Sequence, residues 1–328
     1  MQFVRTIAVR VAQSLGLLLA VVVLNFTLLK MTPGDPALVI AGESGAADVE
    51  LLEQIREDYG LNESYLVQLT TYVGNVVQGD LGDSFFFNQS VTALIGARLW
   101  PTILLVASAL GFAIVAGVSV GIFTARRPES PVSHFATILA LIGYSMPVFW
   151  TGLLVIILFA AKLSLLPISG MHDVTFEGNW LQSWIDIGEH LILPAFTLGF
   201  LYMAQYSRLS RASMLEVLQS DYVRTARAKG LGERIVVYKH ALRNAVIPVV
   251  TVAGLQFGSL ISGALLVETV FNWPGLGRLA FDSVLRRDMP VLLGILLISA
   301  SLVVAANLLT DLVYRLIDPR IRVGGKSS

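Results

Sequence analysis

One basic stretch, ARAKGLGERIVVYKHALRN (226–244), holds six basic residues and one acid in a chain that is 55% hydrophobic. It belongs to a wider segment, 208–248, that carries eight lysines and arginines. Placing each of these cations in hydrocarbon would cost roughly 2.5–3.5 kcal/mol, so the segment is predicted to lie in water. It could anchor the chain to anionic headgroups, bind nucleic acid, or dock a partner protein on its small tip residues. Nucleic acid is least favoured, because the segment lacks an aromatic platform for bases.

The basic segment is predicted to form two helices joined by a turn. The first should run from 213 to 229 and end at Gly230, which can take a left-handed conformation. Glu233 should start the second helix, with its acid at the positive end of the helix dipole. The apolar stripes expected on the two helices are Leu215, Leu218, Tyr222 and Ala226, and then Ile235, Leu242 and Val246.

No motif of the sequence encodes chemistry that needs a nucleotide, a thiol or a clustered metal site. The phosphate-binding pattern G-x-x-x-x-G-K-[ST] is absent, so the chain has no ATP cradle of its own. It contains no cysteine, and its four histidines fall in separate segments. We therefore expect that the chain is not an enzyme, and that it binds no cofactor and no metal itself.

Long apolar blocks predict an all-α polytopic membrane protein. Charged residues make up 14% of the chain, against roughly 25% in a typical soluble domain. Six blocks are long enough to cross about 30 Å of hydrocarbon as helices. Pro147 should kink the third span, whereas Pro194 should lie in the first turn of the fourth. The predicted spans are 8–29, 101–123, 135–160, 191–207, 247–268 and 290–310.

The distribution of charge predicts the orientation. Sixteen of the 23 lysines and arginines fall in the N-terminus, the loops after spans two and four, and the tail. The positive-inside rule therefore places both termini in the cytoplasm.

The acidic segment 31–99 is expected to lie on the opposite side of the membrane. It carries ten acids. Helical spacing at Val49, Leu52 and Ile55, and again at Leu66, Leu69 and Val73, predicts a small helical extracytoplasmic subdomain. Asn62 is a candidate N-cap for its second helix.

The interiors of the six spans carry no Asp, Glu, Lys or Arg. Proton-driven carriers usually need an ionisable group at membrane depth, so this class is disfavoured. A sodium-coupled carrier that uses backbone carbonyls would escape the test, and a gated pore or simple anchor is a third alternative. The polar residues inside the spans, which could line a wet path or bond a neighbouring helix, are Tyr144, Ser145, Tyr202, Gln205, Gln256, Ser262 and Asn307.

Small residues recur at four-residue spacing in two spans. Such spacing lets helix backbones approach closely. Span two carries Gly117 and Gly121, and span five carries Gly254, Gly258 and Ser262. Span five is thus expected to pack on another helix, in this chain or in a second subunit.

The stretch RTARAKGLGERIVVYKHALRN (224–244) resembles the cytoplasmic coupling loop, or EAA loop, of ABC importer permeases. The likeness is to the B-type permease of the dipeptide, oligopeptide and nickel importer family. Arg224-Thr225-Ala226 occupies the Glu-Ala-Ala position, and Gly230 matches the glycine of the motif. His240 to Arg243 occupies the last element, so arginines replace the usual Glu and Pro. Other matching segments, in order, are MTPGDPA (31–37), GDLGDSF (79–85), ARLWPTILL (97–105), GYSMPVFWTGLL (143–154), LPAFTLG (193–199), DYVRTARAKGL (221–231), HALRNAVIPVVT (240–251), ETVFNWPGLGRLA (268–280), RRDMPV (286–291) and DPRIR (318–322).

The resemblance implies a type I ABC importer permease of the bacterial inner membrane. Its partners would be a homologous C-type permease, two cytoplasmic ATPases that use ATP and Mg, an extracytoplasmic substrate-binding protein, and membrane lipid, with no nucleic acid. The implied parts of the chain are residues 1–30 (N-terminus and first span), 31–99 (extracytoplasmic subdomain) and 100–328 (permease core), the last with a coupling loop at 208–246 and a cytoplasmic tail at 314–328.

The resemblance also implies functional roles for individual residues. The residues expected to couple to the ATPases are Tyr222, Ala226, Arg227, Ala228, Gly230 and Leu231. Spans three and five are expected to line the path through Ser145, Pro147 and Gln256. Dipeptides or oligopeptides are the favoured cargo, with nickel chelates and glutathione as further substrates of the family. An ion-coupled carrier that works without an ATPase is the alternative.

Overall fold

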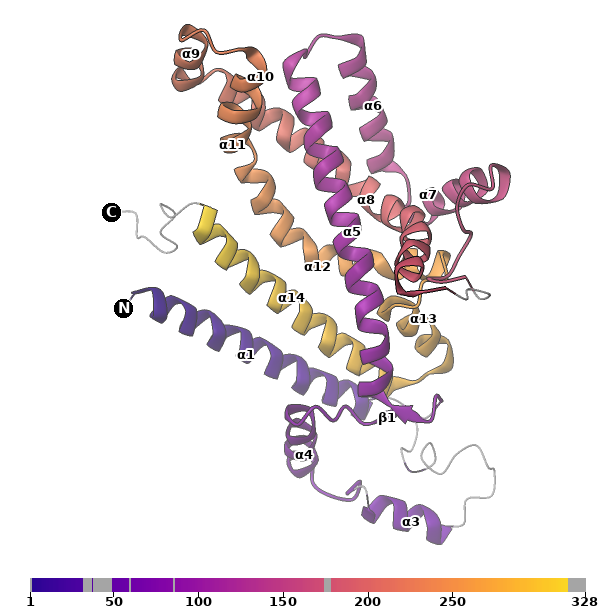
Figure 1. The fold of residues 1–328 in the computed structure, drawn as a ribbon. Coiled ribbons are helices and arrows are strands. Elements are labelled where there is room, and N and C mark those ends of the chain that lie inside the picture. The colour runs from indigo at the N-terminus through magenta and orange to yellow at the C-terminus, as the bar shows by residue number, and fades with distance from the viewer. Residues whose placement is uncertain are drawn as a thin grey trace. The chain divides into compact units, whose positions relative to one another are not determined.

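The chain is helical over most of the residues that its structure, a computed structural model, describes: 2–31, 37, 49–58, 60–84, 86–173 and 178–317. Figure 1 shows the order of the elements. They are α1 (Gln2–Met31), α3 (Val49–Asp58), α4 (Tyr65–Val77), β1 (Asp83–Ser84), β2 (Gln89–Ser90), α5 (Val91–Arg126), α6 (Pro131–Ser145), α7 (Val148–Val155), the π-helix η1 (Ile156–Lys162), α8 (Trp180–Leu218), α9 (Asp221–Ala228), α10 (Glu233–Ile235), the π-helix η2 (Val236–Ala241), α11 (Leu242–Ala245), α12 (Ile247–Val270), α13 (Leu276–Arg286) and α14 (Met289–Ile317).

The helices supply the predicted membrane spans. Five helical segments of the described chain are long and apolar enough to cross a membrane, or six if α6 and α7–η1 count as one bent span. The protein is thus a multi-pass membrane protein. Its chain divides into two compact units, residues 1–100 with 279–304, and residues 101–278 with 305–328.

In the first unit, α1 runs beside the first part of α14 (Figure 1). The buried amide of Asn25 donates to the carbonyl of Leu293 over 2.9 Å, so this polar group in an apolar span is satisfied. The end of α1 also contacts α4, because Thr27 Oγ1 lies 3.0 Å from the hydroxyl of Tyr65. The Phe26 ring packs edge-on against Tyr65, with 5.2 Å between centroids.

The segment predicted to form a helical subdomain does contain two helices, α3 and α4, within its described residues. The expected cap is wrong, however. Ser64 precedes the first residue of α4, and the Asn62 side chain instead donates to Glu53 Oε1 over 3.2 Å. A two-stranded hairpin, β1–β2, follows, and Ser84 from it makes a short hydrogen bond to Asp288.

In the second unit, α5 and α8 pack backbone to backbone through glycines. A Cβ on Gly117 would lie 2.7 Å from Tyr206 Cβ, and one on Gly121 would lie 2.6 Å from Ser210 Cβ. The predicted role of the Gly117–Gly121 pair is therefore confirmed. Gly254 of α12 lies against the side chain of Thr310 in α14, so span five packs on a helix of its own chain. The side chain of Ser262 lies outside the described residues.

The third predicted span is broken rather than kinked. Helix α6 ends at Ser145, α7 begins at Val148, and the two directions differ by 112°. Met146 is extended, with φ −81° and ψ 136°, as expected for a residue whose helical conformation clashes with the following proline ring. Figure 1 shows α7 turning away from α6 at this point.

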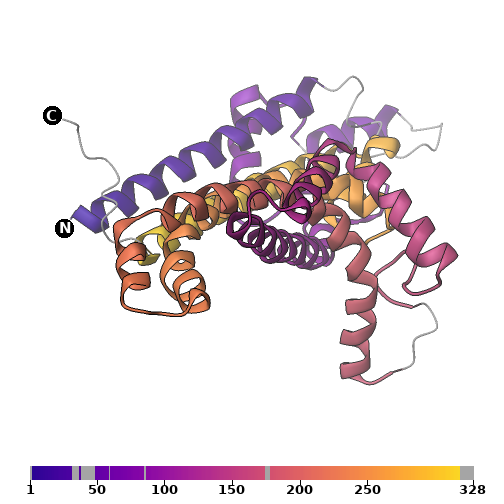
Figure 2. The same ribbon diagram turned by 90° about the horizontal axis from the view of Figure 1, so that it is seen from above.

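The fourth predicted span begins earlier than expected. Asn179 and Gln182 form a capping box, each side chain bonding the other's backbone N–H over 3.0 Å, so α8 starts at Trp180. Pro194 therefore lies inside the helix and not in its first turn, and the prediction is wrong. A proline there removes one helical hydrogen bond. Figure 2 shows the first part of α8 turned steeply from the rest of the helix.

Candidate functional site

The basic segment folds into a corner of short helices, α9 to α11, at the end of α8 (Figure 1). Val223 and Ala226 of α9 are buried inside this corner. They belong to an apolar cluster that joins the corner to the ends of α5 and α8. Its fully and nearly fully buried members are Ile122, Ala125, Met214, Val223, Ala226, Val236, Val237, Ala241 and Ala245.

The tip of the corner is an open turn. Gly230 has φ +76°, and its N–H donates to the Arg227 carbonyl over 2.9 Å, so the predicted left-handed helix end is confirmed. A Cβ built on Gly230 would meet nothing within 4 Å. Ala228 and Leu231 beside it are exposed, which leaves small and apolar side chains at the tip.

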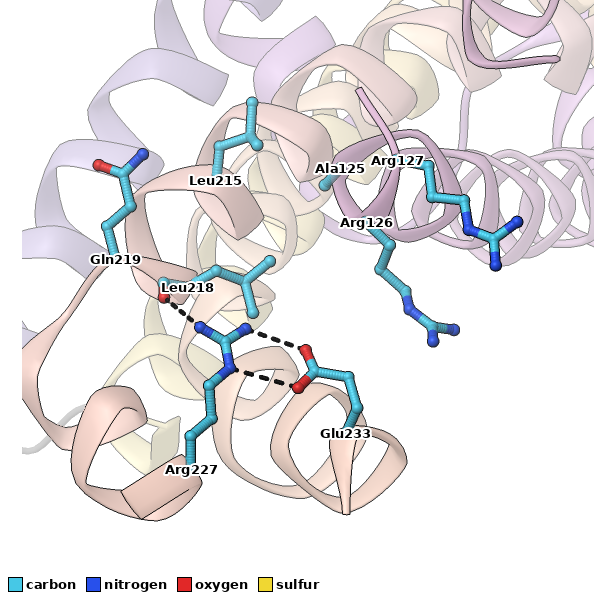
Figure 3. Close-up of a pocket in the computed structure, with 8 residues that line it drawn as sticks. All are labelled: Ala125, Arg126, Arg127, Leu215, Leu218, Gln219, Arg227 and Glu233. Atoms are coloured by element: carbon cyan, nitrogen blue, oxygen red, sulfur yellow. Dashed lines mark hydrogen bonds and ion pairs between the residues drawn. The ribbon is translucent and has the colours of Figure 1, made fainter. Parts of the chain in front are cut away.

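Arg227 fastens the two sides of the turn together (Figure 3). Its guanidinium donates to both carboxylate oxygens of Glu233, over 2.9 and 3.2 Å, and to the Leu218 carbonyl over 3.4 Å. These two side chains lie in the polar loop, outside the predicted spans. The hydrogen bond from Arg227 lowers the pKa of the Glu233 carboxyl from its usual value, so this pair stays charged at neutral pH.

A second link closes the base of the corner. The Asn244 amide donates to the Tyr222 hydroxyl over 2.8 Å and so ties α9 to α11. Tyr222 and Arg227 thus both hold the corner in shape, and neither needs a partner protein to do so.

The structure corrects three details of the predicted corner. The expected helix 213–229 is two helices, because α8 ends at Leu218 and α9 begins at Asp221. Ala226 was expected to enter a partner, but only 6% of its surface is exposed. Ile235 was expected on the buried stripe, yet it is 46% exposed. The π-helix η2 follows Ile235 and shifts the buried face to Val236 and Val237.

The three predicted path residues lie in two places. Gln256 of α12 donates to Gln205 Oε1 of α8 over 2.7 Å, a partner that sequence spacing alone does not reveal. Ser145 and Pro147 lie at the break between α6 and α7, where the Ser145 hydroxyl donates to the Leu141 carbonyl over 3.0 Å. No hydrogen bond among the described residues connects this break to the glutamine pair.

Sequence reasoning missed a buried carboxylate that organises the end of α12. Glu268 has no exposed surface, and it accepts from Thr102 Oγ1 over 2.7 Å. It also accepts from the N–H groups of Gly277 and Arg278, over 2.7 and 3.1 Å, at the start of α13. A carboxylate is favourable there, since it meets free N–H groups and the positive end of a helix. The motif ETVFNWPGLGRLA includes Glu268, Gly275 and Gly277, but the sequence alone does not show that these residues are in contact.

Comparison with known proteins identifies relatives over nearly the whole chain. Residues 117–323 match the family described as the binding-protein-dependent transport system inner membrane component, and residues 3–107 match the N-terminal part of such a membrane component. The dipeptide transport system permease protein DppB of Alkalihalophilus pseudofirmus is 41% identical over 320 residues, covering 93% of this chain and 95% of the relative. The oligopeptide transport system permease protein AppB of Bacillus subtilis is 42% identical over 314 residues, covering 95% and 97%.

A solved structure confirms the permease fold. A chain of the MetNI methionine ABC transporter, in an inward facing conformation, superposes with a TM-score of 0.55 at 17% identity. The match covers 69% of this chain and 96% of that chain.

Proposed function

Because this chain belongs to the family of binding-protein-dependent transport system inner membrane components, we propose that it forms half of the membrane path of an ATP-driven peptide importer. The relatives that are 41–42% identical are named as dipeptide and oligopeptide permeases. Peptides are therefore the favoured cargo, ahead of nickel chelates and glutathione. The comparisons give no support to an ion-coupled carrier that works without an ATPase.

The coupling role rests on one observation, a braced corner with an exposed tip. Arg227 and Tyr222 fix the corner internally, so a force on the tip would move the corner as one body. Ala228, Gly230 and Leu231 would enter a groove on an ATPase subunit, because their small side chains allow close approach. Ala226 would act from inside, by packing the corner onto α5 and α8.

The remaining parts of the importer would be separate chains. Two cytoplasmic ATPases would bind ATP and Mg, and their closure would move the corner. A homologous C-type permease would form the other half of the path. The acidic segment 31–99 would help to dock an extracytoplasmic substrate-binding protein. This arrangement requires the orientation in which both termini are cytoplasmic.

The path would pass the polar groups of spans three to five. The Gln205–Gln256 pair is the strongest candidate, because amide groups can bond the backbone of any peptide while ignoring its side chains. Ser145 and Pro147 would contribute where the broken span frees backbone carbonyls. A path without charge would suit a cargo of variable sequence.

Gly230→Leu provides the test, with uptake of a labelled dipeptide measured in cells that lack the chromosomal copy. We expect uptake to fall at least tenfold at normal membrane abundance, because a side chain at Gly230 would project outward onto the partner's surface. Gly170→Leu is the matched control. Gly170 also has a positive φ, +90°, and a Cβ there would meet only the His172 carbonyl oxygen, at 3.5 Å, so it carries the same backbone strain away from the corner and outside the segment 31–99.

Two outcomes would count against the proposal. Equal uptake by the wild type and Gly230→Leu would remove the coupling role from the tip. Dipeptide uptake that is unchanged in cells without the chain, alongside loss of nickel or glutathione uptake, would reassign the cargo.

A further inference from the structure

A hollow of about 350 Å³ lies where the corner meets the ends of α5 and α8. Figure 3 shows the side chains around it. Three arginines and one glutamate supply its charge, and leucines and an alanine supply an apolar wall. The lining residues are Ala125, Arg126, Arg127, Leu215, Leu218, Gln219, Arg227 and Glu233.

The hollow carries a net positive charge, and not all of its cationic groups are paired with an acid. Glu233 is already neutralised by its two contacts with Arg227. The side chains of Arg126 and Arg127 make no hydrogen bond and no ion pair with the part of the chain that the structure describes, and Figure 3 shows none between them and the other lining residues. The charge of Arg126 also acts on Glu233, but without a hydrogen bond. The donors of both guanidinium groups therefore remain available to an anion, and each group presents five donors in a planar fork that suits phosphate oxygens.

The depth of the hollow matches the headgroup layer of a bilayer. Gly121 of α5 contacts α8 at Ser207, Ser210 and Arg211, on both sides of the first charge after the fourth predicted span, Arg208. Arg126 lies three residues beyond the predicted end of span two at residue 123, or about 4.5 Å of helix. A bilayer's polar headgroup layer extends about 5–7 Å beyond the hydrocarbon on each side. The arginines thus reach the level at which lipid phosphates lie.

We propose that this hollow binds the phosphate-bearing headgroup of an anionic phospholipid, from the leaflet predicted to face the cytoplasm. Arg126 and Arg127 bind the phosphate, and Leu215 and Leu218 contact the glycerol and the first methylenes of the acyl chains. The mixed lining favours a lipid over a free anion, which would gain nothing from the leucines. It also favours a lipid over an acidic protein segment, because basic pockets between membrane helices on the cytoplasmic side characteristically hold lipid headgroups.

A lipid bound in the hollow would stabilise the position of the corner relative to α5 and α8. The hollow is bounded by Arg126 at the end of α5 and by Arg227 inside the corner. A bound headgroup would connect these two groups and stabilise the corner against the spans. The binding itself does not depend on the proposed transport activity, so the two can fail separately.

The test measures lipid binding to the full-length chain, purified in mild detergent with whatever partners it retains. Native mass spectrometry would follow titrations with phosphatidylglycerol, phosphatidylethanolamine and inorganic phosphate. We expect phosphatidylglycerol to bind at least tenfold more tightly than phosphatidylethanolamine, and inorganic phosphate not to displace it at millimolar concentration. The double variant Arg126→Gln with Arg127→Gln should bind phosphatidylglycerol about 10–30-fold more weakly, since each arginine at an anionic surface contributes about 1 kcal/mol.

The matched control is Arg234→Gln with Lys239→Gln, which removes two exposed cations from the basic segment 208–248 but none from the hollow. It should bind phosphatidylglycerol as the wild type does. Equal weakening in both double variants would overturn the proposal in favour of a general charge effect. Displacement by inorganic phosphate would overturn it in favour of a free anion. Unchanged lipid binding with loss of a co-purifying protein from the Arg126/Arg127 variant would overturn it in favour of protein docking.

Discussion

Glu268 illustrates how one residue can set the local geometry of a membrane protein. A fully buried carboxylate is costly unless its oxygens are satisfied. Here one oxygen accepts from Thr102 and the other accepts from Gly277 and Arg278, so the charge is well solvated by the protein. The close fit explains the glycine at 275, because a Cβ there would lie 2.2 Å from the carboxylate.

Glu268→Ala should destabilise the protein by about 3 kcal/mol, because one buried and two partly buried donors lose their acceptor at about 1–3 kcal/mol each. Glu268→Gln keeps one acceptor oxygen and should fall between alanine and the wild type. Thermal unfolding of the purified proteins in detergent measures the order of stability of the wild type and the two variants. Glu216→Ala, at an exposed position of α8, is the control and should unfold as the wild type does. A Glu268→Ala variant as stable as that control would show that the carboxylate is not structural.

At the scale of elements, the contact between α5 and α8 depends on the absence of side chains. Gly121 brings the α5 backbone so near to α8 that a Cβ would lie 2.8 Å from the Ser207 carbonyl oxygen. Gly111 lies on the same helix, but a Cβ there would meet nothing within 4 Å. The two glycines therefore differ in their surroundings while sharing a helix and a membrane environment.

Gly121→Leu should force α5 and α8 apart and lower stability by about 1–3 kcal/mol or more, the usual cost of overpacking. Gly111→Leu should be tolerated, since its side chain enters open space. The amount of folded protein recovered from membranes and its thermal unfolding measure the difference. Similar values for the two variants would contradict the close α5–α8 contact.

The sequence predicts elements better than it predicts their ends. The apolar blocks give the spans, and residue type gives the left-handed turn at Gly230, because both depend on local chemistry. The break after Ser145 was expected only as a kink, since a 112° change of direction depends on what α6 and α7 each pack against. The shifted face after Ile235 depends on a π-helix, which has no simple sequence pattern. The Arg227–Glu233, Gln205–Gln256 and Glu268 contacts escaped prediction because the turn or the tertiary fold brings their partners together.

At the scale of the whole molecule, the corner is the place where an ATPase subunit would push on the membrane spans. The chain has no phosphate-binding motif of its own, and its family works with partner proteins. An exposed tip on an internally braced corner is the form such a contact requires. The absence of cysteine is useful here, because one introduced thiol would be the only thiol in the chain.

The most direct measurement is site-specific crosslinking from Leu231→Cys in native membranes, with a short bifunctional reagent and mass spectrometry of the adduct. We predict an adduct between residue 231 and an ABC ATPase subunit. We predict no such adduct from Val77→Cys, at an exposed position of α4, because the charge distribution predicts that this helix lies on the opposite side of the membrane. Failure of Leu231→Cys to crosslink to any ATPase, while an ATPase still co-purifies with the chain, would contradict the coupling role of the corner.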